Sequence, residues 1–363
     1  MRDAVSQIER RSDQRVTRTY AGRMTRGAGS TLPTSGMSVP DVLASGRRSY
    51  SFEFFPPKNA EGEITLWKAI RRLESYHPTF VSVTYGAGGG NRGGVIEVTK
   101  RIAEETTLTP MAHLTCVGHS RAELRQVIGA YADAGVRHIL ALRGDPPGGP
   151  EQPWERHPDG FDHAVELVEF IRTLGRFDVA VAAFPDKHPG SADLDFDTRV
   201  LAAKADAGAT FAITQLFFDS EPYLRLVDRL AATGREMPII PGIMPITNVS
   251  QIKRMASFSG APIPKRVLDA IEPHADDPDA VRAIGIDLAS RLCTDLLAAG
   301  APGLHFMTLN RSTATRAIYA NVVASEPPPV PPSPARAPAA AAVPIAATAS
   351  APDSSSVGSP AGR

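Results

Sequence analysis

Short runs of apolar, β-branched or aromatic residues recur along the middle of the chain, and longer amphipathic stretches separate them. Runs of this length, bounded by turn residues, are typical of buried β-strands. Eight such runs occur, at 50–56, 80–86, 111–117, 138–144, 179–185, 211–218, 238–244 and 303–310.

The stretches between these runs have the pattern of helices. Residues 61–76, 122–135, 162–175 and 223–234 are amphipathic, and the last three of these stretches end in glycine, as helices often do. Strands that alternate with helices are typically parallel, and eight such units favour an α/β fold closed into a (β/α)8 TIM barrel. The stretch 247–299 is longer than one unit needs, so we expect extra helices before the last strand.

The composition along the chain predicts three regions. Residues 1–47 are rich in Arg, Ser, Thr and Gly, and we expect a disordered N-terminal extension. A transit peptide, or an over-long start with Met37 as the true initiator, is the alternative there. Residues 48–323 form the catalytic barrel, close to the ~250 residues typical of this fold. Residues 324–363 are rich in Pro and Ala and predict a disordered tail.

The charge and the cysteine content limit the kinds of molecule that the protein is expected to bind. The 39 basic residues balance 39 acidic residues, so no net field favours nucleic acid or an anionic membrane. Cys116 and Cys293 form no C-x-x-C pair, which argues against a disulfide scaffold or a cysteine zinc site. No apolar stretch reaches the roughly 18 residues of a membrane span. We therefore expect a cytoplasmic protein that acts on small molecules and holds no metal.

Polar side chains follow most of the predicted strands. Active sites of TIM barrels lie at the carboxyl ends of the strands, so these side chains are candidate site residues. Any one of them alone could be a helix cap or a loop residue. They are Glu53, Thr84, Tyr85, His113, Arg143, Asp145, Asp186, His188, Gln215, Asn310 and Arg311.

Glu53 lies within an aromatic run, YSFEFFPP, where an unpaired charge would be costly to bury. Alternation along a strand places Ser51, Glu53 and Phe55 on one face, and Phe52 and Phe54 on the other. Glu53 then faces the mouth of the barrel. We expect burial against aromatic rings to raise the pKa of Glu53 and to keep a proton available near neutral pH.

Several short motifs point to other functions but lack their context. The segment GAGGGNRG contains G-x-G-x-x-G, yet the next predicted strand ends without the acidic residue of a dinucleotide-binding domain. A glycine-rich loop that approaches a ligand is the simpler interpretation. The chain contains no G-x-x-x-x-G-K-[ST] loop and no H-E-x-x-H pair, so nucleotide hydrolysis and zinc proteolysis lack their usual signals.

The set of strand-end residues suits a large, partly planar ligand such as a flavin or a pterin. Eight segments also resemble, in order, the bacterial methylenetetrahydrofolate reductases, and the resemblance covers residues 38–323. The segments are SFEFFPPK (51–58), FVSVTYGAGG (80–89), AHLTC (112–116), LRGDPP (142–147), VAAFPDKHP (181–189), ITQLFFD (213–219), IIPGIMPI (239–246) and HFMTLNRS (305–312).

The resemblance implies a TIM barrel that binds FAD noncovalently and uses NADH or NADPH as the reductant. In this family NAD(P)H reduces the flavin and leaves, and the reduced flavin then converts 5,10-methylenetetrahydrofolate to 5-methyltetrahydrofolate, the methyl donor for methionine synthesis. Family members are homo-oligomers. Two alternatives stay open, namely a flavin-independent reductase and a catalytically silent folate-binding subunit.

Roles carry over by position. Glu53 matches the general acid, and Asp145 matches an acidic residue near flavin and folate, so both are catalytic candidates. The substrate-binding positions are Thr84, Asp145, Gln215, Gln251 and Arg311. The positions that contact FAD are Tyr85, Ala87, His113, Arg143, Gly144, Asp145, Ala164, Phe184, His188, Asp197 and Lys204.

Three features depart from the family pattern. Phe184 stands where the family often has Tyr, and Met255 stands where some members place a Phe that packs on the ligand. The segment 148–161 and His163 align poorly and receive no role. The cations of the FAD set are kept, whereas a flavin-independent enzyme would lose them, and a silent subunit would have altered Glu53 or Gln215.

Overall fold

The computed structural model describes residues 37–85, 92–149 and 152–324. Nine strand segments form one parallel sheet in the order β7-β6-β5-β4-β3-β2-β1-β9-β8. Their bounds are β1 (Ser49–Phe54), β2 (Phe80–Val83), β3 (Pro110–Thr115), β4 (His138–Leu142), β5 (Asp178–Ala183), β6 (Phe211–Thr214), β7 (Ile239–Ile240), β8 (Gly242–Ile243) and β9 (Gly303–Met307).

The sheet closes through β7 and β8, which are two halves of one strand. β7 pairs with β6, and β8 pairs with β9 on the other side. Pro241 lies between the halves and has no N–H group to donate, so it interrupts the strand. Its carbonyl oxygen still accepts a hydrogen bond from the His305 N–H group (2.9 Å). The eight predicted strand positions and the TIM barrel are therefore confirmed.

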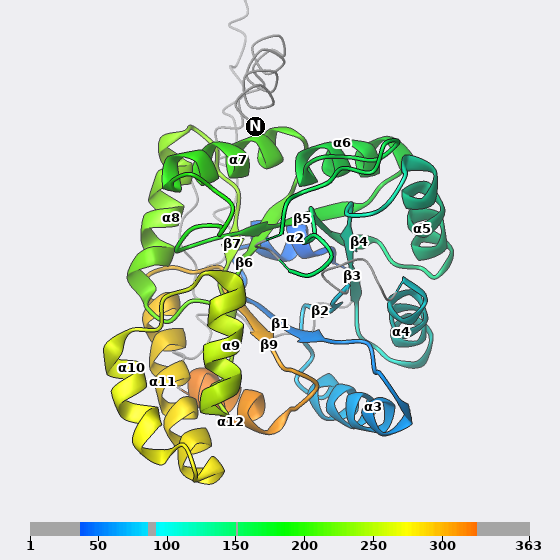
Figure 1. The fold of residues 1–363 in the computed structure, drawn as a ribbon. Helices are drawn as coiled ribbons and strands as arrows, with labels where there is room; N and C mark the ends of the chain where they lie inside the picture. The colour runs from blue at the N-terminus through cyan, green and yellow to red at the C-terminus, as the bar shows by residue number, and fades with distance from the viewer. Residues whose placement is uncertain (1–36, 86–91, 150–151, 325–363) are drawn as a thin grey trace, which may run out of the picture. The chain divides into compact units, whose positions relative to one another are not determined.

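Helices follow the strands and surround the barrel (Figure 1). The predicted helices and the extra helices before the last strand are confirmed. The bounds are α2 (Val39–Ala44), α3 (Ala60–Glu74), α4 (Arg92–Glu105), α5 (Arg121–Asp133), α6 (Ala164–Leu174), α7 (Leu194–Asp206), α8 (Ser220–Ala232), α9 (Val249–Ser259), α10 (Lys265–Ile271), η1 (Glu272–His274), α11 (Pro278–Ala298) and α12 (Thr313–Ala324).

The alternation predicted for β1 is confirmed. Phe52 and Phe54 are fully buried in the main hydrophobic core, which also contains Leu66 and Ile70 of α3. Ser51 and Glu53 point the other way, into the barrel, where both contact His305. The aromatic residues of β1 thus hold the strand against its helices, and its polar residues face the interior.

A short helix closes the amino-terminal end of the barrel. Val39 and Leu43 of α2 pack into a cluster with Phe80 and Phe211, at the starts of β2 and β6. Figure 1 shows α2 within the outline of the strand ring, whereas the other helices surround it. Access to the barrel interior from this end is blocked by apolar packing.

Helix α2 lies inside the range 1–47 that the sequence analysis assigned to a disordered extension, and that assignment is wrong for 39–44. Ser38 and Asp41 form a capping box, which satisfies the first backbone N–H groups of the helix. The apolar side chains of α2 are too few to show a periodicity. Residues 1–36 and 325–363 lie outside the described residues, and their disorder stays a prediction.

The extra helices α9, α10 and α11 have a hydrophobic cluster of their own, with Ile252, Val267 and Val281 from the three helices. Met244 and Met307 belong to the same cluster and tie it to the barrel. Among the described residues, no helix is both long and apolar enough to cross a membrane.

Gly285 in the interior of α11 allows that helix to approach the barrel closely. A Cβ atom at this position would overlap the carbonyl oxygen of Ile246. Gly129 in the interior of α5 is a matched control, because a Cβ atom there meets nothing within 4 Å.

We expect Gly285→Ala to lower the free energy of unfolding by about 1–3 kcal/mol, because α11 must move away from the backbone at Ile246. Gly129→Ala should instead raise it by about 0.5–1 kcal/mol, the usual gain of helix propensity. Urea unfolding of both variants checks this, and equal effects of the two substitutions would contradict the close approach.

Candidate active site

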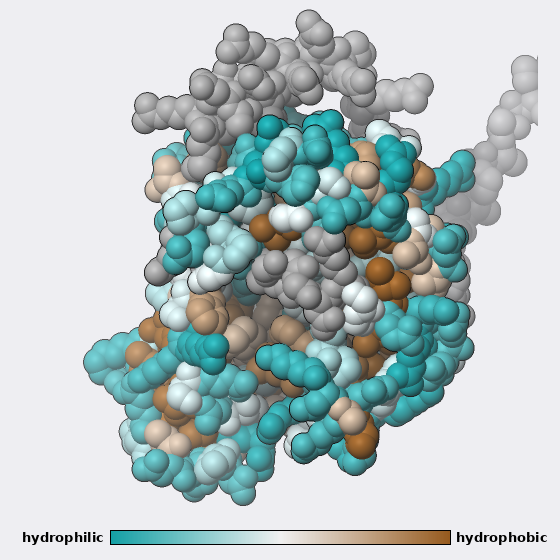
Figure 2. Space-filling view, turned by 45° about the vertical axis from the view of Figure 1, so that its right-hand side comes forward, coloured by the Kyte–Doolittle hydropathy of each residue, from teal (hydrophilic) through white to brown (hydrophobic). Residues whose placement is uncertain are grey.

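A large cavity opens at the carboxyl ends of the strands. Its volume is about 1990 Å³, against the roughly 300–1,000 Å³ of a typical small-molecule pocket. It extends from Glu53 and Thr84 to the first turns of α6 and α7. Figure 2 shows hydrophobic residues gathered around a hollow on an otherwise mostly hydrophilic face. The cavity can therefore hold a ligand larger than one ordinary substrate.

Glu53 lies at the inner end of this cavity, and donors hold both of its carboxylate oxygens. Oε1 accepts a hydrogen bond from the Thr84 hydroxyl (2.8 Å), and Oε2 lies 3.1 Å from His305 Nε2. His113 Nε2 lies 4.0 Å from the same Oε2 atom and has no hydrogen-bond partner among the described residues. Glu53 is 9% exposed, and the open side of its carboxylate faces the cavity.

The expected rise in the pKa of Glu53 is wrong. Burial does raise it, but the hydrogen bond from His305, the nearby His113 and His305 rings and the Thr84 bond outweigh burial and lower the pKa to about 2. Burial lowers the pKa of His113 to about 4, so this ring is neutral at neutral pH. Glu53 is therefore ionised at neutral pH in the ligand-free protein.

Cationic and hydrogen-bonding groups line the wall formed by β4, β5 and α7. Lys204 of α7 is 8% exposed, and its Nζ atom donates to the carbonyl oxygen of Ala182 (2.9 Å). Burial lowers the pKa of Lys204 to about 8, with Asp197 opposing that shift. Arg143 follows β4 and lines the same cavity. These two cations make the wall a favourable site for an anion.

The loop after β5 is fixed against α7. The His188 N–H group donates to Asp197 Oδ2 (2.7 Å), and Ser191 donates to the other carboxylate oxygen of Asp197. Burial lowers the pKa of His188 to about 4, assisted by the nearby cations. Phe184 meets the His188 ring edge-on at 4.7 Å. The His188 ring is thus neutral at neutral pH and held at the cavity wall.

A second loop, within the segment that received no role, orders Arg143. Trp154 donates from Nε1 to Asp162 Oδ1 (2.5 Å), and the Arg143 guanidinium lies 4.7 Å from the Trp154 ring centroid. Arg143 also donates to the carbonyl oxygen of Gly144. The stacked ring limits the orientations of the guanidinium, which sequence reasoning did not anticipate.

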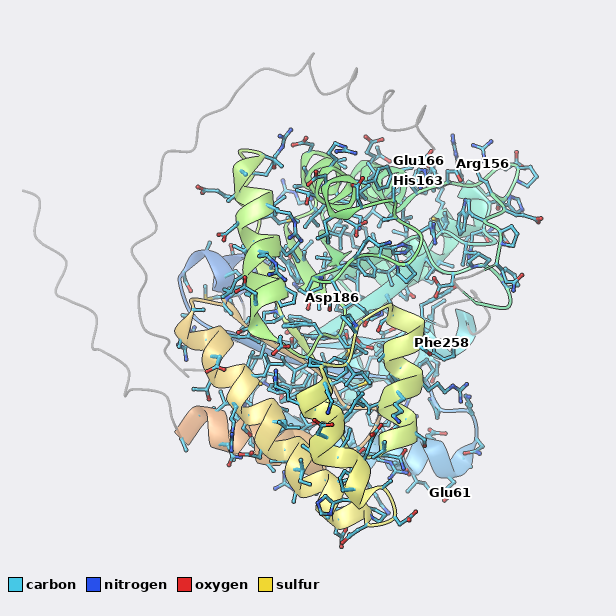
Figure 3. The ribbon with its side chains drawn as sticks, turned by 60° about the vertical axis from the view of Figure 1, so that its left-hand side comes forward. Glu61, Arg156, His163, Glu166, Asp186 and Phe258 are labelled. Carbon is cyan, nitrogen blue, oxygen red and sulfur yellow. The ribbon has the colours of Figure 1, made fainter. Side chains whose placement is uncertain are left out.

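Asp145, Gln215, Met255 and Phe258 also line the cavity. Burial raises the pKa of Asp145, and Arg143 opposes that shift. Phe258 is 50% exposed at the cavity rim, one helical turn after Met255. Figure 3 shows Phe258 at one end of α9, on the same side of the molecule as Arg156. Aromatic and thioether surface is therefore available to a planar ligand.

The structure brings most of the predicted site residues to this cavity. They are Glu53, Thr84, Tyr85, His113, Arg143, Gly144, Asp145, Ala164, Phe184, His188, Asp197, Lys204 and Gln215. Gln251 and Arg311 are exposed and do not belong to its lining. The Tyr85 hydroxyl bonds His119 Nε2 in the core. Ala87 lies outside the described residues.

His305 is the site residue that sequence reasoning missed. It appears in the quoted segment HFMTLNRS, but no motif marks it. The alternation of side chains along β9 could have identified it. Leu304 and Phe306, on either side of His305, belong to the outer core, so His305 must face the interior of the barrel. Within the described ranges, no group of three or more His, Cys, Asp or Glu residues could hold a metal ion.

Together the fold and the cavity define a TIM-barrel enzyme that acts on a large organic ligand. A model of the methylenetetrahydrofolate reductase family matches residues 38–323. The chain belongs to this family of oxidoreductases of one-carbon metabolism, and its reaction is the reduction of methylenetetrahydrofolate.

Curated relatives agree over most of the chain. A 5,10-methylenetetrahydrofolate reductase of Pectobacterium carotovorum subsp. carotovorum is 42% identical over 275 residues, which cover 75% of this chain and 89% of the relative. The Escherichia coli (strain K12) protein of the same name is 40% identical, over 75% and 90% of the two chains. A plant relative, methylenetetrahydrofolate reductase (NADH) 1 of Arabidopsis thaliana, is 36% identical over 78% of this chain and 50% of its own length.

A solved structure shares the fold at lower identity. An uncharacterized protein from Clostridium thermocellum that binds two copies of 5-methyl-5,6,7,8-tetrahydrofolic acid has a TM-score of 0.55 and 13% identity. The match covers 77% of this chain and 96% of that chain. At this identity the likeness shows the fold alone.

The depressed pKa of Glu53 should make this residue a source of stability that acid removes. The stabilisation is present above the unfolded-state value of 4.5 and is lost as the pH falls through the folded value of about 2. The difference in unfolding free energy between wild type and Glu53→Gln should therefore be constant near neutral pH and shrink, by on the order of 3 kcal/mol, across that window. Denaturant unfolding at a series of pH values measures it, and a difference that grows toward low pH would contradict it.

Proposed function

We propose that this protein reduces 5,10-methylenetetrahydrofolate to 5-methyltetrahydrofolate with FAD as its bound cofactor and NADH or NADPH as the reductant, in a ping-pong sequence. The product supplies methyl groups for methionine synthesis. One observation carries the proposal: a single cavity joins the buried acid Glu53 to a wall that bears Arg143 and Lys204. The acid suits proton delivery to the folate, and the wall suits the diphosphate of the cofactor.

The residues present fit FAD. The buried Lys204 ammonium carries three N–H donors, and its hydrogen bond among the described residues goes to Ala182. Its remaining donors, together with the Arg143 guanidinium, can neutralise a diphosphate. Asp197 and Ala164 at the first turns of α7 and α6 place backbone and acceptor groups on the same wall. A flavin-independent reductase would not need this set, so its presence favours the flavin-dependent reaction.

When bound, FAD accepts a hydride from the nicotinamide and supplies it to the methylene carbon of the folate. The protein's residues manage the proton and the geometry. Opening of the folate ring breaks a C–N bond of the methylene group, and the released nitrogen takes a proton. Glu53, with its open side toward the cavity, is the group we assign to deliver that proton.

Glu53 must first gain a proton, because it is ionised in the ligand-free protein. A bound folate closes the cavity to water and removes solvent from the open side of the carboxylate, which favours the protonated form. Asp145, whose pKa burial already raises, lies on the same cavity wall and can accept hydrogen bonds from the pterin. Gln215 offers an amide to either the folate or the nicotinamide.

The test compares wild type with Glu53→Gln. We expect purified wild type to be yellow or to gain flavin bands with FAD, to bleach on anaerobic addition of NADH or NADPH, and to be reoxidised by methylenetetrahydrofolate. Glu53→Gln should bleach normally but be reoxidised at least ~100-fold more slowly, because it has no acid to donate. A protein that never acquires flavin bands would overturn the proposal, and fast folate turnover in the variant would remove Glu53 from the mechanism.

A second expectation concerns cofactor affinity. Lys204→Met keeps the buried volume of the side chain but removes its charge, so FAD should bind about 10–100-fold more weakly, the usual cost of losing a charged hydrogen bond. Lys265→Met is the control, because Lys265 lies exposed on α10 and pairs with Asp269. Fluorescence titration of the apoprotein with FAD measures both, and equal affinities would exclude Lys204 from the cofactor site.

A further inference from the structure

A buried chain of polar side chains lies behind Glu53. His305 of β9 contacts Glu53 Oε2 through Nε2 (3.1 Å), and its Nδ1 atom lies 2.8 Å from the Ser51 hydroxyl. Ser51 and His305 are both fully buried. Phe80 stacks on the His305 ring, with ring centroids 5.6 Å apart and planes 16° apart. The imidazole is therefore fixed in position from three sides.

The contacts on the two sides of the His305 ring indicate which of its nitrogen atoms carries the proton. A neutral imidazole has one donor nitrogen and one acceptor nitrogen. The other acceptor within reach of the Ser51 hydroxyl is the carbonyl oxygen of Leu304, which lies farther away at 3.4 Å. The ionised Glu53 carboxylate can only accept, so the proton of a neutral ring is on Nε2, where it points at Glu53, and Nδ1 is left to accept from the Ser51 hydroxyl.

The two hydrogen-bond donors to Glu53 differ in which protonation state of the carboxyl group they allow. The Thr84 hydroxyl can donate to a carboxylate or turn and accept from a carboxylic acid, so it fits either state of Glu53. The Nε2–H group of His305 can only donate while Ser51 holds the other nitrogen as an acceptor. It therefore favours the ionised state. His113, the other titratable group near this carboxylate, is neutral at neutral pH and too distant for a hydrogen bond.

We propose that His305, held by Ser51 and Phe80, is a positioning residue that keeps the Glu53 carboxylate ionised and turned toward the cavity until a ligand enters. Its consequence for catalysis rests on the acid role of Glu53 proposed above. The proton that Glu53 delivers must come from the cavity side, because His305 and Ser51 are sealed from solvent behind it. His305 then sets the pH range over which Glu53 can take up that proton.

Two variants of His305 separate its hydrogen bond to Glu53 from its packing against Phe80. His305→Phe keeps a flat ring to stack on Phe80 but has no N–H group, whereas His305→Gln keeps an amide N–H group that can reach Glu53. Without the donor, burial dominates, and Glu53 should be protonated well above its ordinary range. We expect the Glu53 midpoint to rise by at least about one pH unit, a tenfold change in proton affinity, in His305→Phe and to change little in His305→Gln.

Infrared spectroscopy of the purified proteins reads this directly without any turnover. As the pH is lowered from 7, the carbonyl band of protonated Glu53, identified by its loss in the same protein carrying Glu53→Gln, should appear at least about one pH unit higher in His305→Phe than in wild type and His305→Gln. A His305→Phe protein that folds and shows this band at the same pH as wild type would overturn the inference. If His305→Phe fails to fold, Ser51→Ala removes the donor to Nδ1 instead, with Ser51→Thr as its control, and an unchanged Glu53 midpoint in Ser51→Ala would overturn it.

The pH profile of the folate step adds a second readout. The pH at which flavin reoxidation by methylenetetrahydrofolate loses half its rate should shift upward in His305→Phe and be restored toward wild type in His305→Gln. An unshifted profile together with a protonated Glu53 would overturn the catalytic part of the inference. Rapid folate turnover in Glu53→Gln would instead overturn the acid role of Glu53 and leave the infrared result on ionisation standing.

Discussion

A carboxylate buried inside a barrel needs hydrogen-bond donors, and the register of three neighbouring strands supplies them to Glu53. β1 pairs with β9 so that Ser51 faces His305, and it pairs with β2 so that Ser82 faces Glu53. Thr84, two residues after Ser82, then reaches the Glu53 carboxylate. A slip of one residue would turn Glu53 toward the helices and put a phenylalanine into the barrel. The packing of Phe52 and Phe54 against the outer helices prevents that slip. The chemistry of the site thus depends on an apolar contact on the opposite face of the same strand.

Much of the fold could be predicted from local pattern. The strand runs are apolar enough to be recognised, and the single break, at Pro241, still left a continuous run. In a TIM barrel the carboxyl ends of all the parallel strands meet at one face, and the active site lies there. Polar residues at those strand ends could therefore be expected to come together, and thirteen of the predicted site residues line one cavity. Helix α2 could not be predicted in this way, because its three buried apolar side chains gain their stabilisation only from a barrel end that the sequence does not display.

The protonation state of Glu53 could not be predicted from the sequence, for a related reason. Its aromatic neighbours in YSFEFFPP flank it in the chain, but flanking residues of a strand point to the opposite face. The groups that surround the carboxylate come from residues 84, 113 and 305, which are distant in sequence. Gln251 and Arg311 illustrate the same limit, because the arrangement of α9 and of the turn after β9 decides whether they reach the cavity, and both are exposed here.

The apolar seal that α2 makes at the amino-terminal end has a consequence for how molecules reach the inner end of the site. Val39 and Leu43 fill that end, and Ser51 and His305 pack behind Glu53. The described part of the barrel is therefore open only at the carboxyl ends of its strands. Any two molecules that must both reach the inner end of the cavity have to enter through this same opening.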